Sequence, residues 1–144
     1  MRAPKFIKQL REPEIVAAIR AAEQKTSGEL RVFISRKDVA DPVAAAQAEF
    51  TRLGMTQTRE RNAVLIYLAP GSRKFAVIGD QGVHVRCGDA FWQELAGAMT
   101  KHFRTGEFTD GIVQGIKHAG ELLAEHFPRR PDNDNELPDR VEHD

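Results

Sequence analysis

The sequence predicts one α/β domain, a three-layer α/β/α sandwich in which a small mixed β-sheet is flanked by about four helices. Helical and strand-like hydrophobic patterns alternate along the 144 residues, a length that fits a single core. Residues 63–68 form a continuous apolar run, which is typical of a strand covered by helices on both faces. A second apolar run, residues 74–78, follows a Pro-Gly turn, so the two runs predict an antiparallel hairpin.

The first part of the chain predicts two helices and one strand before this hairpin. A helical apolar face begins at Pro13, a residue suited to a first helical turn, and Gly28 marks the expected end. Residues 29–35 alternate with period two, which indicates a strand. Asp41, followed by a proline, provides the N-cap of a second helix, which we expect to end at Gly54.

The last part of the chain predicts two further helices and a polar tail. Residues 79–82, Gly-Asp-Gln-Gly, are expected to form a loop, after which Asp89 caps a helix, and a final amphipathic helix follows. Residues 129–144 contain three basic and six acidic side chains and almost no apolar ones, which predicts a disordered tail. With residues 1–10 as an N-terminal extension, the domain then spans residues 11–128.

Three polar segments are expected to meet at one edge of the sheet. The helical connection between the first two strands makes them parallel, and the hairpin reverses the third strand. The end of the third strand therefore lies beside the starts of the other two, which brings together residues 26–29, 56–62 and 79–82. This edge is the candidate site. Asp80 between two glycines has open access to a cation or a phosphoryl group, and Arg59 and Arg61 suit bidentate phosphate contacts.

A structural role for the same residues is the alternative. Asp80 would then cap a turn, the two flanking glycines would adopt positive φ, and the two arginines would be solvated loop residues. The sequence leaves both interpretations open.

Several other side chains give weaker signals for chemistry. The five histidines lack zinc-ligand spacing, and only His84 lies near the loop as a potential acid or base. Cys87 lies near an expected helix start, where a thiol pKa can fall, but a buried position is more typical of an unpaired cysteine. Phe91, Trp92 and Phe103 could form a ligand shelf, although their helical spacing favours a place in the core.

The order and spacing of several motifs resemble the TPM domain family, named for a thylakoid lumen phosphatase, a photosystem-repair protein and an acetylcholine-receptor modulator. Residues 26–32, Thr-Ser-Gly-Glu-Leu-Arg-Val, are similar to the strand entry of that family, and residues 61–66, Arg-Asn-Ala-Val-Leu-Ile, to its Asn-Gly-Val-Leu-Leu strand. Residues 77–84 and 103–112 are similar to parts of the stretch from its third strand through its last two helices. The resemblance covers roughly residues 11–128.

This resemblance implies the same sandwich and two functions. Some members are credited with acid phosphatase activity and divalent-metal binding, often calcium, whereas others act as assembly or accessory factors. We therefore expect a binding or accessory module that recognises a protein or a small anion through the polar edge. The alternative is a weak acid phosphatase dependent on calcium or magnesium. Its metal ligands would be Asp80, Asp89 and Glu29, and its catalytic set Asp80 and Asp89 with Arg59 or Arg61 against the phosphoryl oxygens.

The composition limits the classes of partner and the cellular location that we expect for the protein. The 21 basic and 21 acidic residues cancel, so a nucleic-acid partner is not expected. A single cysteine excludes an internal disulfide, and we find neither a signal-peptide core nor an apolar run of about 18 residues that could span a membrane. We expect a cytoplasmic, monomeric protein.

Overall fold

The hydrophobic patterns of the sequence become regular elements in a computed structural model that describes residues 10–129 and 141–143. The helices are α2 (Glu12–Glu23), α3 (Pro42–Arg52), α4 (Gln81–Arg104) and α5 (Phe108–His126), with two short 3₁₀ turns, η1 (Met55–Gln57) and η2 (Pro70–Ser72). The strands are β1 (Glu29–Ile34), β2 (Ala63–Ala69), β3 (Lys74–Gly79) and β4 (Val141–His143).

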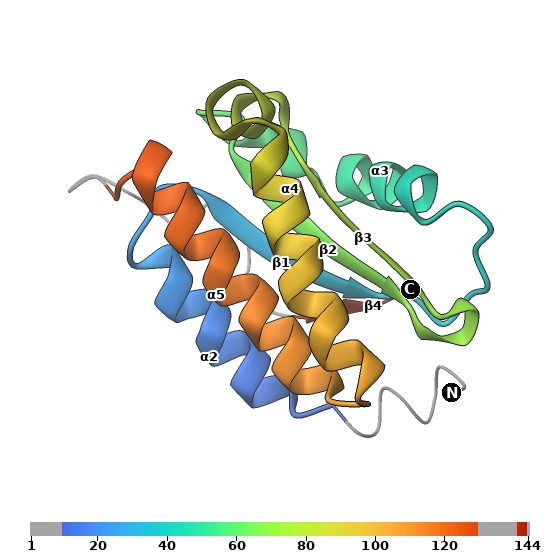
Figure 1. Ribbon diagram of the computed structural model, residues 1–144. Coiled ribbons are helices and arrows are strands. Elements are labelled where there is room, and N and C mark those ends of the chain that lie inside the picture. Colours follow the sequence, from blue (N-terminus) through green and yellow to red (C-terminus); the bar gives the residue numbers. More distant parts are fainter. Residues whose placement is uncertain (1–9, 130–140, 144) are drawn as a thin grey trace.

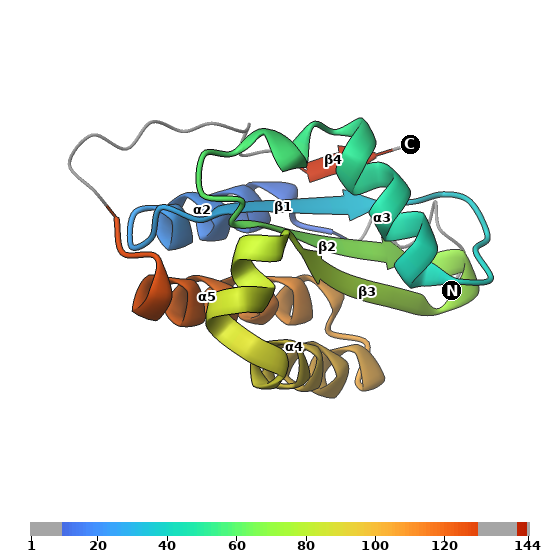
Figure 2. The ribbon, with the colours of Figure 1, turned by 90° about the horizontal axis from the view of Figure 1, so that it is seen from above.

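The elements form three layers around a mixed sheet, as expected. The strand order is β3-β2-β1-β4, in which β1 is parallel to β2 and to β4, while β3 is antiparallel to β2. Helices α2, α4 and α5 cover one face of the sheet and α3 covers the other (Figures 1 and 2). The β1–α3–β2 unit makes the two central strands parallel, and the hairpin then places β3 at the margin of the sheet.

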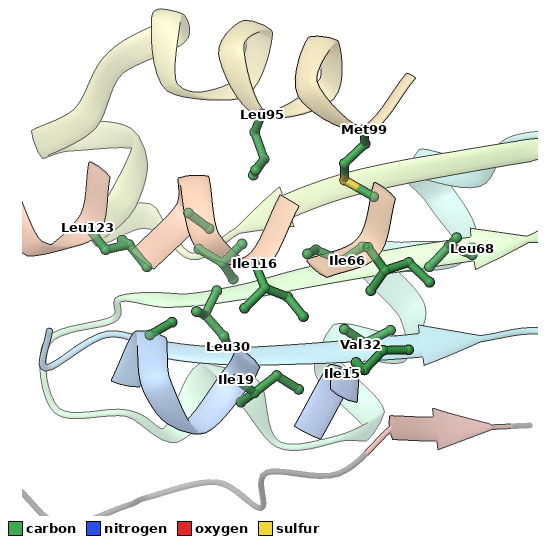
Figure 3. Close-up of a cluster of buried hydrophobic side chains, with 14 of the residues drawn as sticks. Ile15, Ile19, Leu30, Val32, Ile66, Leu68, Leu95, Met99, Ile116 and Leu123 are labelled. Carbon is green, nitrogen blue, oxygen red and sulfur yellow. The ribbon is translucent and has the colours of Figure 1, made fainter. Parts of the chain in front are cut away.

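The larger part of the core lies between the sheet and the three-helix layer. Leu30 and Val32 point to this side from β1, and they pack with Ile19 of α2 and Ile116 of α5 (Figure 3). The opposite face holds a smaller cluster under α3, in which the rings of Phe33 and Tyr67 stack with centroids 5.5 Å apart. Each large aliphatic side chain buried in this way stabilises the fold by about 1.5–3 kcal/mol relative to exposure.

Two helix boundaries differ from the expectation. Helix α2 ends at Glu23 rather than at Gly28, because Thr26 and Ser27 leave the helical path to donate hydrogen bonds to the Phe127 carbonyl oxygen. Helix α4 begins at Gln81, so the loop expected at residues 79–82 is in fact the helix start. Gly88, whose φ is 73°, breaks the helical path within α4, and the second and longer helical segment begins at Asp89, as expected.

The end of the chain also departs from the expectation of a disordered tail. Val141–His143 forms β4, which adds to the sheet beside β1. Glu142 reaches across to Arg31, with 2.8 Å between its Oε1 and the Arg31 Nη2, and the Arg31 side chain is only 4% exposed. A short strand with few apolar residues is therefore held by a buried ion pair. The remaining tail residues, 130–140 and 144, and the expected N-terminal extension up to residue 9 lie outside the described residues.

Candidate functional site

The three polar segments meet at one edge of the sheet, where the strand pairing places them. Glu29 pairs with Ala63 at the starts of β1 and β2, and Val64 pairs with Gly79 at the end of β3. The loops that precede β1 and β2 therefore lie beside the start of α4. The predicted convergence is confirmed, and the contacts within it define the chemistry of the site.

Arg61 and Asp80 form the central ion pair of this edge. The Arg61 Nε and Nη2 donate to the two carboxylate oxygens of Asp80 at 2.6 and 2.8 Å, and the Asp80 carboxylate also accepts from the Gln81 N–H at 2.8 Å. The hydrogen bonds to Asp80 raise the pKa of Arg61 above its ordinary value. Asp80 thus caps helix α4 and neutralises Arg61, which holds an uncommon positive φ of 52°.

A second network joins the loops before β1 and β2. The Ser27 hydroxyl donates to the Glu60 carboxylate at 2.7 Å, and the Asn62 amide nitrogen donates to Glu60 at 3.1 Å and to Ser27 at 3.2 Å. The Asn62 backbone N–H donates to the Thr58 hydroxyl at 3.3 Å. Ser27, Thr58 and Asn62 are all buried. These hydrogen bonds therefore connect the loop before β1 to the loop before β2.

The other expected site residues lie apart from the ion pair. Glu29 is buried in β1, Arg59 is an exposed residue of the loop before β2, and Asp89 is exposed beyond the α4 kink. In the described ranges no three or more His, Cys, Asp or Glu side chains are grouped to hold a metal ion, so Glu29, Asp80 and Asp89 do not form one ligand set.

The two glycines have a role different from the positive φ considered for them, whereas the environment of Cys87 agrees with a structural thiol. Neither Gly79 nor Gly82 has positive φ; both are needed because of close approach. A Cβ on Gly79 would lie 2.5 Å from the Trp92 ring, and one on Gly82 would lie 2.6 Å from the Arg61 carbonyl oxygen. Burial, with a smaller contribution from Glu125, raises the pKa of the Cys87 thiol, so the helix start does not activate it.

Two substitutions of Asp80 separate its role as the N-cap of α4 from its ion pair with Arg61. Asp80→Ala should lower the free energy of unfolding by about 1–2 kcal/mol, because helix α4 loses its N-cap. Asp80→Asn keeps an acceptor for the cap and should cost less. Urea denaturation followed by circular dichroism measures both values. Equal losses in the two variants would contradict a capping role for Asp80.

A groove that sequence reasoning did not find opens beside Asp80. This β3 groove has a volume of about 370 Å³ and lies between α3 and α4. Its walls are Val43, Gln47, Phe50 and Thr51 of α3, Thr56 of η1, the stretch from Val77 to Asp80, and His84 and Trp92 of α4. The His84 and Trp92 rings lie 4.9 Å apart. The helical spacing of the aromatic residues indicated a core, and Phe91 is buried in it; the half-buried Trp92 packs against that core and also lines the groove.

Among the strands that the structure describes, none pairs with the outer side of β3 (Figure 2). The Asp80 N–H donates to the Ala63 carbonyl oxygen at 3.0 Å, which fixes the alternation of the antiparallel ladder. By that alternation, Phe75, Val77 and Gly79 direct their N–H and C=O groups away from β2. These groups have no backbone partner among residues 10–129 and 141–143. Such an edge is a template for another strand.

Comparison with known proteins decides the family. The family model of the TPM domain matches residues 3–122, most of the chain. The chain belongs to the TPM domain family. The BA42 protein of the psychrophilic bacterium Bizionia argentinensis, solved by NMR, is 38% identical to it, with a TM-score of 0.87 and 92% of each chain covered.

Two more distant solved structures share the fold of this TPM domain. The N-terminal domain of a P. gingivalis protein is 17% identical, with a TM-score of 0.60 and coverage of 79% of this chain and 75% of that one. The N-terminal domain of a Corynebacterium glutamicum protein is 23% identical, with a TM-score of 0.56 and coverage of 76% and 68%. No curated protein matches the chain. Within the described part of the TPM domain, no helix is both long and apolar enough to cross a membrane.

Proposed function

We propose that this TPM domain is a binding module that takes up an extended apolar segment of a partner polypeptide along the outer edge of β3. The observation that carries the proposal is the row of outward N–H and C=O groups at Phe75, Val77 and Gly79, beside the β3 groove. An added strand would satisfy these groups, and its alternate side chains would enter the groove. Apolar side chains suit the groove because Val43, Phe50 and Trp92 line it.

The polar edge stabilises one wall of the β3 groove. Arg61 is engaged by Asp80, and Asp80 caps the first segment of α4, which carries His84 of the groove wall. The ion pair thereby fixes the start of α4, which forms one wall of the groove. A small anion would have to compete with Asp80 for Arg61, so a polypeptide at the strand edge is the better-supported ligand.

The alternative, a divalent-metal-dependent phosphatase, gains no comparable support. Asp80 already accepts from Arg61 and from Gln81, and the carboxylates proposed with it do not converge in the described residues. Hydrolysis of a generic phosphomonoester that needs calcium or magnesium and is lost in Asp80→Asn would favour the enzyme instead.

Peptides selected from a displayed random library test the binding proposal. Trp92 is the single tryptophan of the chain, so its fluorescence reports binding at the groove without interference. Val43→Asp introduces a charge into the apolar wall at the first turn of α3, where an acidic residue is compatible with the helix. We expect it to weaken peptide binding at least tenfold, about 1.4 kcal/mol.

Val85→Asp provides the matched control. Val43 and Val85 are both exposed valines, at 47% and 83%, but Val85 does not line the groove. Val85→Asp should leave the peptide affinity unchanged. Failure of any library peptide to bind, or equal weakening by both variants, would contradict the proposed site.

A further inference from the structure

A second cavity lies at the opposite end of β3 from the β3 groove. It has a volume of about 480 Å³, which is within the range of small-molecule sites, and it lies between the β2–β3 hairpin and the C-terminal half of α4. Its apolar walls include Leu68, Phe75, Phe103 and Phe108. The Phe75 and Phe103 rings meet edge to face, with centroids 5.3 Å apart. We name this cavity the hairpin pocket.

Among the residues that the structure describes, the lining of the hairpin pocket carries cations and no carboxylate. Arg73, Lys74 and Arg104 belong to it, and all three are exposed. The Lys74 ammonium group is engaged, because it donates to the Ala40 carbonyl oxygen at 2.8 Å. Within the described part of the chain, neither the Arg73 nor the Arg104 guanidinium has an ion-pair partner. Two guanidinium groups without an ion-pair partner in the described residues thus border an aromatic cavity.

We propose that the hairpin pocket binds a small amphipathic carboxylate. The apolar body of the ligand would fill the space beside Phe75, Phe103 and Phe108, and its carboxylate would accept hydrogen bonds from Arg73 and Arg104. A guanidinium fork matches the two oxygens of a carboxylate, and the pairing also relieves the unbalanced positive charge. The site is separate from the β3 groove and does not depend on the peptide proposal.

Three probes with the same eight-carbon body test the charge and the cavity separately. Octanoate, octan-1-ol and octylammonium are titrated into the ¹⁵N-labelled full chain, and amide shifts are followed by NMR. Octanoate should shift the amides of Phe75, Phe103, Gly106 and Phe108 saturably, octan-1-ol should bind at least fivefold more weakly, and octylammonium should not bind. Equal affinities for octanoate and octan-1-ol, or octanoate shifts confined to other residues, would overturn the proposal.

Charge-removing variants complete the test. Arg73→Gln and Arg104→Gln should each weaken octanoate binding at least threefold, whereas Lys117→Gln, an exposed residue of α5 outside the pocket, should not. Unchanged octanoate affinity in both arginine variants would overturn the assignment. Co-sedimentation with phosphatidylglycerol vesicles that is lost in Arg73→Gln but not displaced by octanoate would also overturn it, because the arginines would then serve a membrane surface.

Discussion

Gly82→Ala should lower the free energy of unfolding by about 3 kcal/mol, a large effect for one methyl group. The added Cβ would press on the carbonyl oxygens of Glu60 and Arg61, and these are backbone atoms that cannot rotate away. The Gly82 N–H also donates to the Arg61 carbonyl oxygen at 2.9 Å, so displacement of the helix start would lengthen that bond. Chemical denaturation measures the loss.

Gly97→Ala is the matched control on the same helix. Gly97 lies in the interior of α4, and a Cβ there would meet no atom within 4 Å. Because alanine is the better helix former, this variant should gain about 0.5–1 kcal/mol. Opposite signs for the two substitutions would show that the close approach at the polar edge, and not the loss of glycine from α4, causes the effect. A Gly82→Ala protein as stable as wild type would contradict the packing described here.

Glu142→Ala should cost about 3 kcal/mol and release β4 from the sheet. Removal of the carboxylate leaves the Arg31 guanidinium in a position where its side chain is only 4% exposed. The Leu53 carbonyl oxygen, 3.4 Å from the Arg31 Nη1, is a neutral acceptor and does not replace the lost negative charge. Amide hydrogen exchange should therefore accelerate at Val141 and His143, and denaturation should give the free-energy change.

The double substitution Arg31→Met with Glu142→Leu separates the buried charge from the strand pairing. Replacement of a buried ion pair by apolar side chains is often close to neutral, so this variant should regain most of the stability lost in Glu142→Ala. If Glu142→Ala itself changes stability by less than about 0.5 kcal/mol, within the range of ordinary surface substitutions, then the ion pair does not hold β4.

Local patterns were sufficient to predict most of the fold. The alternation of residues 29–35, the apolar run at 63–68 and the Asp41 cap each act within one element, and each appears in the structure within about a residue. The direction of the strands followed from connection rules, and it placed Arg61 beside Asp80. Local composition failed at β4, because the Arg31–Glu142 pair joins residues far apart in the chain.

The function of the polar edge depended on contacts that spacing does not show. Asp80 between two glycines fits both an open ligand loop and a helix N-cap, and the contacts of Asp80 with Gln81 and Arg61 distinguish them. The β3 groove likewise depends on contacts between residues that are far apart in the sequence. Val43 and Trp92 are 49 positions apart in the sequence and line one hollow because α3 and α4 lie on opposite faces of the same strand edge (Figure 1).

The most direct test of the binding proposal is the detection of intermolecular NOEs between the labelled protein and a bound library peptide. Strand addition predicts regularly spaced contacts from the peptide backbone to Phe75, Val77 and Gly79, together with peptide side-chain contacts to Trp92 and Val43. Contacts confined to the loops around Arg61, or a bound peptide with no cross-strand NOE to β3, would contradict it.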